Sequence, residues 1–412
     1  MPQRTPRERT PREVQRRRRM KRAAMGLFAT VAVLADTGAA AAQAAAGSEQ
    51  IAITTPPAGS AQWVADRSLG RVLPDPATAA PRDVAAFFAS LSPAETDRLI
   101  GEYPLVVGNL DGAPPALRYR ANRLAIAAER DRARTQAADP KLSVGARALA
   151  EARANDSEHL LEPGRQVLAF DPRGRGLVSE VYGDLASAQR VSVLVPGSES
   201  DLGHFDQAAE PLRSPAGMGR ALYEEEKRRA SGTRTAVIAW TGYVSPVGLG
   251  PDAVTSRLAD AAAPRLERLL DGLAVTGRTD APPTLFCHSY GSVVCGTAAP
   301  AIHDGTDLVV FGSPGMGVSD AAALGTGVRV WATRNPSDWI GNVPYLEVGG
   351  LGHGADPTSP DFGSVVISST GASGHNGYLA PDTASLRNFA ELGLGHYDEV
   401  RTAARRGAAD PS

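Results

Sequence analysis

Residues 282–296 read PPTLFCHSYGSVVCG: an apolar run, then a small polar turn, then small residues that suit a helix. This order is typical of a nucleophile elbow, the strand, turn and helix that hold a catalytic serine on a strained turn. The usual pattern is G-x-S-x-G, and Ser289 and Gly291 match its serine and its second glycine. Cys287 replaces the first glycine. Because an isolated S-x-G also marks ordinary turns, this interpretation depends on the rest of the chain.

The residues that would activate Ser289 follow it in the order that such an elbow requires. A nucleophilic serine needs a histidine base, and the base needs a carboxylate that orients it. In the α/β-hydrolase arrangement the acid and then the histidine come after the serine. Asp338 follows a predicted strand at 328–332, and His375 lies on a glycine-flanked loop after a predicted strand at 363–368. We therefore predict a triad of Ser289, Asp338 and His375.

Three other histidines are weaker candidates for the base. His353 precedes the last predicted strand and ranks second, and His396 follows the final predicted helix and ranks third. His288 is adjacent to the serine, so the two side chains should diverge.

Two backbone N–H groups are predicted to bind the oxyanion. One belongs to Tyr290, the residue after the nucleophile, and the other comes from the loop after a predicted strand at 190–195. Ser198 is the preferred donor in that loop, with Gly197 as the alternative. An ordinary turn would also explain this Pro-Gly sequence.

The pattern of strands and helices predicts an α/β fold with a mostly parallel central sheet. A hairpin over 166–170 and 176–181 should give the sheet an antiparallel edge, and strands then alternate with helices. Further strands are predicted at 235–240, 284–287 and 307–311, and helices at 215–229, 254–273 and 386–394. A helical N-terminal segment at 82–165 should precede the hydrolase domain at 166–405, and residues 47–81 are rich in Pro, Ala and Gly, which is typical of a linker.

The N-terminus predicts export. Arginines at 16–19 precede a short apolar run and then an A-x-A sequence, which is the order of a signal peptide. We expect the signal peptide to cover residues 1–46, with cleavage near Ala44–Ala46, by the general secretory or the twin-arginine route; an uncleaved anchor is the alternative. The protein is then secreted or held in the cell envelope.

Composition narrows the classes of partner and cofactor. The formal net charge of −2 over 412 residues gives no general reason to expect nucleic-acid binding. No phosphate loop, dinucleotide fingerprint or zinc motif is present in the sequence, so no cofactor and no metal are expected. The two cysteines, Cys287 and Cys295, flank the proposed nucleophile and form either a disulfide or two buried thiols.

The chain resembles a bacterial family of α/β hydrolases of unknown function that carry a helical leader. The resemblance covers roughly residues 82–395 and depends on PLVVGNLDG at 104–112, VPGS at 195–198, HSYGS at 288–292 and GSPG at 312–315. It implies an α/β-hydrolase fold and a Ser/Asp/His triad at the positions chosen above. It implies no substrate.

The sequence therefore predicts an exported serine hydrolase that acts through an acyl-enzyme on Ser289. Its substrate would be a small-molecule or lipid-like ester, close to a membrane or the cell envelope. An acyltransferase or a peptidase on the same fold is the first alternative. A non-catalytic binding protein of the cell envelope on a hydrolase scaffold is an alternative from another class.

Overall fold

The computed structural model describes residues 49–277, 279–325 and 327–403. The predicted signal peptide at 1–46 lies outside these residues. In the described part of the chain, no helix combines the length and the apolar character needed to cross a membrane.

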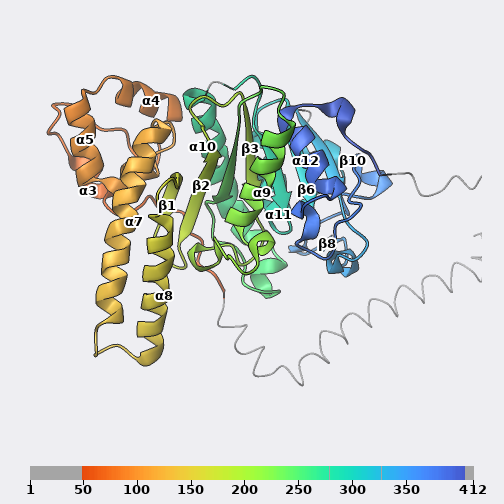
Figure 1. Ribbon diagram of the computed structural model, residues 1–412, viewed down its shortest axis with the longest axis horizontal. Coiled ribbons are helices and arrows are strands. Elements are labelled where there is room, and N and C mark those ends of the chain that lie inside the picture. Colours follow the sequence, from red (N-terminus) through yellow and green to blue (C-terminus); the bar gives the residue numbers. More distant parts are fainter. Residues whose placement is uncertain (1–48, 278, 326, 404–412) are drawn as a thin grey trace, which may run out of the picture. The chain divides into compact units, whose positions relative to one another are not determined.

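The central element is an eight-stranded sheet with the order β1-β2-β4-β3-β5-β6-β7-β10 (Figure 1). Strands β1 and β2 form an antiparallel hairpin, β2 pairs antiparallel with β4, and the remaining pairs are parallel. The strands are β1 (Val167–Asp171), β2 (Leu177–Gly183), β3 (Arg190–Val195), β4 (Thr235–Thr241), β5 (Thr284–His288), β6 (Thr306–Phe311), β7 (Val328–Thr333) and β10 (Val365–Val366). The predicted fold class is confirmed, although β10 is shorter than the predicted strand at 363–368.

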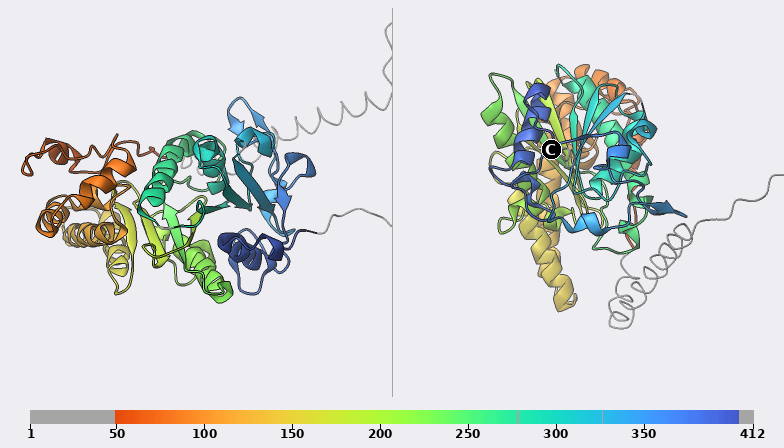
Figure 2. Two further views of the ribbon diagram at one scale, coloured as in Figure 1. Left: turned by 90° about the horizontal axis from the view of Figure 1, so that it is seen from above. Right: turned by 90° about the vertical axis from the view of Figure 1, so that its right-hand side faces the viewer.

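Helices cover both faces of this sheet, because the inner strands are apolar on both sides. Helices α10 (Arg257–Thr276) and α11 (Gly291–Ala298) contact each other, and α9 (Pro215–Arg229) contacts α12 (Ala384–Leu394). Seen from above in Figure 2, α10 lies on one face and α9 and α12 on the other. Alternate side chains of a strand therefore enter different cores: Leu285 and Cys287 of β5 pack with α10 and α11, whereas Phe286 packs with α9 and α12.

The first part of the helical leader, up to Ala121, packs into a core of its own, whereas Ala125, Ile126 and Leu160 pack with strands β1 and β2. Its helices are α3 (Ser60–Ala65), α4 (Pro81–Ala89), α5 (Pro93–Glu102), α6 (Pro104–Gly108), α7 (Pro115–Ala137) and α8 (Val144–Leu160). The interpretation of 47–81 as a linker is wrong for α3, because Trp63 is fully buried and donates from its indole to the Pro74 carbonyl at 2.6 Å. The Pro- and Ala-rich composition around Trp63 gave no indication that this residue is buried.

The VGNLDG segment attaches the leader to strand β1, at the edge of the sheet. The Asn109 amide donates to the Phe170 carbonyl at 2.7 Å and accepts from the Phe170 N–H at 3.2 Å. Asn122 and Arg118 of α7 donate to the carbonyls of Val167 and Leu168, both at 3.0 Å. Side chains thus satisfy backbone groups that an edge strand otherwise leaves open.

Candidate active site

Ser289 lies on a strained turn between β5 and α11. Its φ is +53°, a left-handed conformation that few residues other than glycine adopt. Its backbone N–H donates to the Phe311 carbonyl of β6 at 3.1 Å, which anchors the turn to the neighbouring strand. Such strain costs on the order of 1–3 kcal/mol and persists only where the surroundings enforce it. The elbow predicted from the sequence is therefore present.

The residues two positions before and after Ser289 are both small, but for different physical reasons. A Cβ at Gly291 would lie 2.1 Å from the Val195 carbonyl oxygen, so only glycine fits there. Cys287 instead faces α11 and forms a disulfide with Cys295, with the Cα atoms 6.5 Å apart. Of the two alternatives left open by the sequence, the structure contains the disulfide. The bridge occupies the space between strand and helix where the superfamily pattern has glycine.

Ser289, His375 and Asp338 form one hydrogen-bonded chain. Nε2 of His375 lies 2.9 Å from Oγ of Ser289, and Nδ1 lies 2.9 Å from Oδ1 of Asp338. The acid follows β7 and the histidine follows β10, so both reach the carboxyl edge of the sheet where β5 ends. The structure thus brings together the three side chains predicted as a triad.

Asp338 is held as an anion by the groups around it. Its side chain is fully buried, which by itself favours the neutral acid. Against this burial, the hydrogen bonds from His375, from the Tyr378 hydroxyl at 2.6 Å and from the Ile340 N–H at 2.9 Å lower the pKa of Asp338 below its ordinary value. Tyr378 was not predicted from the sequence, and only its position three residues after His375 connects it to the site.

His288 supports the loop of His375, a role that was not predicted from the sequence. Its Nε2 lies 2.9 Å from the backbone carbonyl of His375, and its ring stacks on Phe311 with centroids 5.0 Å apart. Burial, and then the proximity of His375, lower the pKa of His288 to about 3. The neutral ring therefore donates to the His375 carbonyl. His288 and Ser289 both contact His375, His288 at its backbone carbonyl and Ser289 at Nε2.

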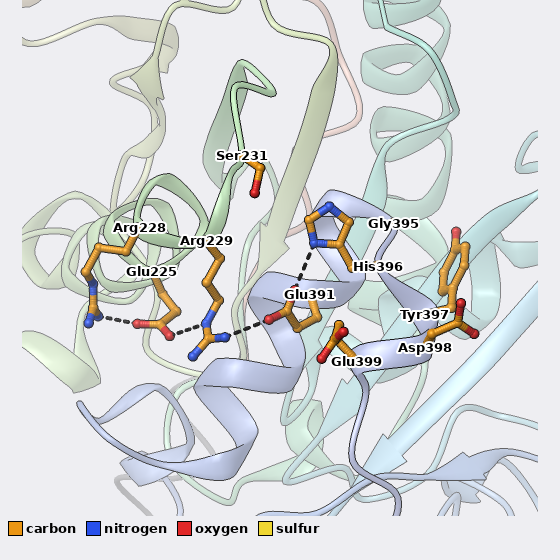
Figure 3. Close-up of a pocket in the computed structure, with 10 residues that line it drawn as sticks. All are labelled: Glu225, Arg228, Arg229, Ser231, Glu391, Gly395, His396, Tyr397, Asp398 and Glu399. Carbon is orange, nitrogen blue, oxygen red and sulfur yellow. Dashed lines mark hydrogen bonds and ion pairs between the residues drawn. The ribbon is translucent and has the colours of Figure 1, made fainter.

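The structure places the other two candidate bases elsewhere. His353 is buried, with Nε2 2.8 Å from the Ala253 carbonyl, and its ring packs edge-on against Tyr290. Burial lowers its pKa despite that hydrogen bond. His396 lies in a separate pocket formed by the ends of α9 and α12, where its Nδ1 is 2.9 Å from Glu391 (Figure 3).

The loop after β3, which is predicted to supply an oxyanion donor, lies close to Ser289. A Cβ at Gly197 would lie 2.6 Å from Cβ of Ser289, so this glycine permits the loop to approach the nucleophile. The Tyr243 hydroxyl donates to the Pro196 carbonyl at 2.6 Å and also contacts the Gly197 carbonyl at 3.3 Å. Because C=O and N–H of a trans peptide point in opposite directions, the N–H groups of Gly197 and Ser198 are directed away from Tyr243. Ser198 and Tyr290 stay predicted donors, with Gly197 as the alternative nearest to Ser289.

Trp339 is a further residue of the site that the sequence did not reveal. It follows the acid directly, and its ring packs on His375 with centroids 4.9 Å apart, while 42% of the residue is exposed.

A strained serine, a histidine on its hydroxyl and a buried carboxylate on that histidine are the arrangement of an α/β hydrolase. Comparison with known proteins agrees with this class. A family model described as alpha/beta hydrolase matches residues 171–348. An uncharacterized protein of Mycobacterium bovis is 34% identical over 185 residues, which are 43% of this chain and 68% of that protein. The chain therefore belongs to the α/β-hydrolase family.

A longer match extends over the leader. An uncharacterized protein of Mycobacterium tuberculosis is 29% identical over 388 residues, which cover 80% of this chain. This chain spans only 57% of the length of that relative.

Solved structures with weak similarity include an α/β serine hydrolase of Xanthomonas campestris, at a TM-score of 0.34 and 16% identity, covering 57% of this chain and 96% of that one. The esterase LipW of Mycobacterium marinum has a TM-score of 0.32 and 13% identity, covering 67% of this chain and 90% of that one.

Proposed function

We propose that this protein is an exported carboxylic-ester hydrolase that acts through an acyl-enzyme on Ser289. The observation that carries the proposal is the hydrogen-bonded chain from the Ser289 hydroxyl through His375 to the buried Asp338. A hydroxyl beside a neutral imidazole can lose its proton as it attacks, and the carboxylate stabilises the imidazolium that forms.

In the first half-reaction, His375 takes the Ser289 proton while Oγ bonds to the ester carbonyl carbon. The carbonyl electrons move onto oxygen, where the N–H groups of Tyr290 and of Ser198 or Gly197 would hold the negative charge. When this intermediate collapses, the carbon–oxygen bond to the leaving group breaks and His375 gives its proton to the departing alcohol. Water then repeats the sequence on the acyl-enzyme, releasing a carboxylic acid and restoring Ser289.

The disulfide supports the exported part of the proposal. Disulfides persist in oxidising compartments and are rare in the cytosol. The Cys287–Cys295 bridge lies inside the elbow, and both cysteines are fully buried. It fits a protein that folds outside the reducing cytosol, as the predicted signal peptide also indicates.

A fluorophosphonate probe tests the nucleophile. Wild-type protein should be labelled covalently at Ser289, with peptide mass spectrometry locating the adduct, and Ser289→Ala should not be labelled. Ser292→Ala is the matched control, because Ser292 lies one helical turn away and its hydroxyl is occupied by the Ser289 carbonyl and Ser313. A well-folded wild-type protein that takes no label would contradict the proposal and favour a non-catalytic binding protein.

Acyl transfer and peptide cleavage are the two alternatives on the same fold. The products separate them: hydrolysis with an added alcohol still yields mainly free acid, whereas an acyltransferase yields mainly the new ester. Aminoacyl anilides in the same assay report peptidase activity.

A further inference from the structure

One exposed aromatic residue, Trp339, lies beside the histidine that would protonate the leaving group. Trp339 packs on the ring of His375, at a centroid distance of 4.9 Å. The carboxylate of the preceding residue, Asp338, is hydrogen-bonded to His375, Tyr378 and the Ile340 N–H. These bonds fix the backbone that carries Trp339. The indole is nevertheless 42% exposed, so one part of it faces outward beside the reacting histidine.

The chemistry of ester cleavage determines which part of a substrate would lie next to Trp339. The carbonyl oxygen has to point to the N–H groups of Tyr290 and the Gly197–Ser198 loop. The leaving oxygen has to approach Nε2 of His375, because this nitrogen delivers the proton. Two rings pack on His375: the His288 ring at 4.7 Å is buried, whereas the Trp339 ring at 4.9 Å is exposed. Trp339 is therefore the ring beside His375 that the alcohol portion of a bound ester can reach.

Exposed apolar side chains gather in the loops at this edge of the sheet. Most exposed large apolar side chains of the described hydrolase domain lie in the loops after β4 and β7, at the carboxyl edge of the sheet: Leu249, Val254, Trp339, Leu346, Val348 and Leu351. These two loops contact each other, since the Gly352 N–H donates to the Val254 carbonyl at 2.8 Å. Exposed apolar surface concentrated at one site is typical of a binding surface.

We infer that Trp339 binds the leaving group of the substrate and that this leaving group is an apolar alcohol. The inference rests on the proposed ester hydrolysis and adds the chemical class of one half of the substrate. Burying alkyl groups against the indole would stabilise the bound ester roughly in proportion to the area covered. If Trp339 binds the alcohol half, the acyl half should not contact it.

Two ester series test this assignment. One keeps a butyryl group and lengthens an unbranched alcohol from ethyl to octyl, so that the leaving-group pKa hardly changes; the other keeps ethanol and lengthens the acyl chain. In wild-type protein, kcat/KM should rise along the alcohol series by about two- to fourfold per methylene that is buried. Trp339→Ala should flatten this rise and leave the slope of the acyl series unchanged, and Trp339→Phe should restore part of it.

The control is Val275→Ala, which removes an apolar side chain with the same exposed fraction of 42% from the end of α10. It should change neither slope. An equal loss of activity by Trp339→Ala on every ester, with the alcohol slope kept, would overturn the inference and make Trp339 a residue that only positions His375. A changed acyl slope would overturn it too. Wild-type protein that cleaves no ester and takes no fluorophosphonate would instead refute the proposed function, and the assignment of Trp339 with it.

Discussion

Two regions of this molecule contain the same pair of groups, a histidine whose Nδ1 lies 2.9 Å from a carboxylate. At the carboxyl edge of the sheet the pair is His375 and Asp338, with side-chain exposures of 13% and 0%. In the pocket of Figure 3 it is His396 and Glu391, with exposures of 36% and 9%. The distance alone therefore does not distinguish the histidine proposed as the base from a histidine in a partly exposed ion pair.

The difference lies in what else the two pairs contact. The second nitrogen of His375 meets the Ser289 hydroxyl, and the hydroxyl of Tyr378 occupies the other oxygen of Asp338. In the pocket, Glu391 is shared with Arg229, which binds its other oxygen at 2.6 Å. A guanidinium that neutralises the carboxylate weakens its ability to stabilise an imidazolium, and no serine hydroxyl is bonded to His396 within the described residues.

The largest contrast is expected between the two histidines. His375→Ala removes the group that accepts the Ser289 proton and should lower kcat by about 10⁴- to 10⁶-fold on any ester that the wild type cleaves. His396→Ala should leave kcat within about twofold of the wild-type value, because its surroundings contain no reacting group. Steady-state kinetics on a p-nitrophenyl ester measures both. A large loss in His396→Ala with normal activity in His375→Ala would reverse the assignment.

The second largest contrast in kcat is expected between substitutions of the two carboxylates, Asp338 and Glu391. Asp338→Asn keeps the shape of the site but removes the charge that orients and stabilises protonated His375, so kcat should fall by about 10⁴-fold. Glu391→Gln should affect stability more than kcat, because it removes the partner of Arg229 and His396. The ratio of the two kcat values, together with thermal denaturation midpoints, checks this. If the two substitutions lowered kcat equally, Asp338 would not be the carboxylate that assists His375.

The smallest effect concerns the contribution of His288 to the pH dependence of the free energy of unfolding. The pKa of His288 is lowered to about 3 in the folded protein, whereas an unfolded histidine titrates near about 6.5. Between these values the unfolded chain binds the extra proton, so the folded state loses stability as the pH falls from about 6.5 toward 3, by at most about 1.4 kcal/mol per pH unit from this group.

The measurement is the free energy of unfolding in denaturant between pH 7 and 4. His288→Gln removes the titrating group and can still donate a hydrogen bond, so its curve should be flatter than that of the wild type. Parallel curves for the two proteins would contradict a neutral buried His288.

The elbow and the order of the triad were predictable because they depend on local chemistry and chain order. Gly291 had to be small, and Asp338 and His375 had to follow later strands. His288 and Trp339 were not predictable, since a residue beside the serine and a residue beside the acid acquire their roles only from the loop around His375, which lies 86 residues from Ser289 along the chain. The same holds for Trp63, whose burial depends on contacts with α4 and Tyr103 rather than on its own Pro-rich neighbourhood.

The contacts of Asn109, Arg118 and Asn122 with strand β1 also bear on how the protein is made. The ribosome completes the leader before it starts the sheet, so β1 is synthesised next to the side chains that bind its carbonyls. The first strand of the hydrolase domain then has a partner before any other strand exists. A hydrolase domain expressed from residue 166 onward would lack these side chains, and the carbonyls of β1 that they bind would lose their partners.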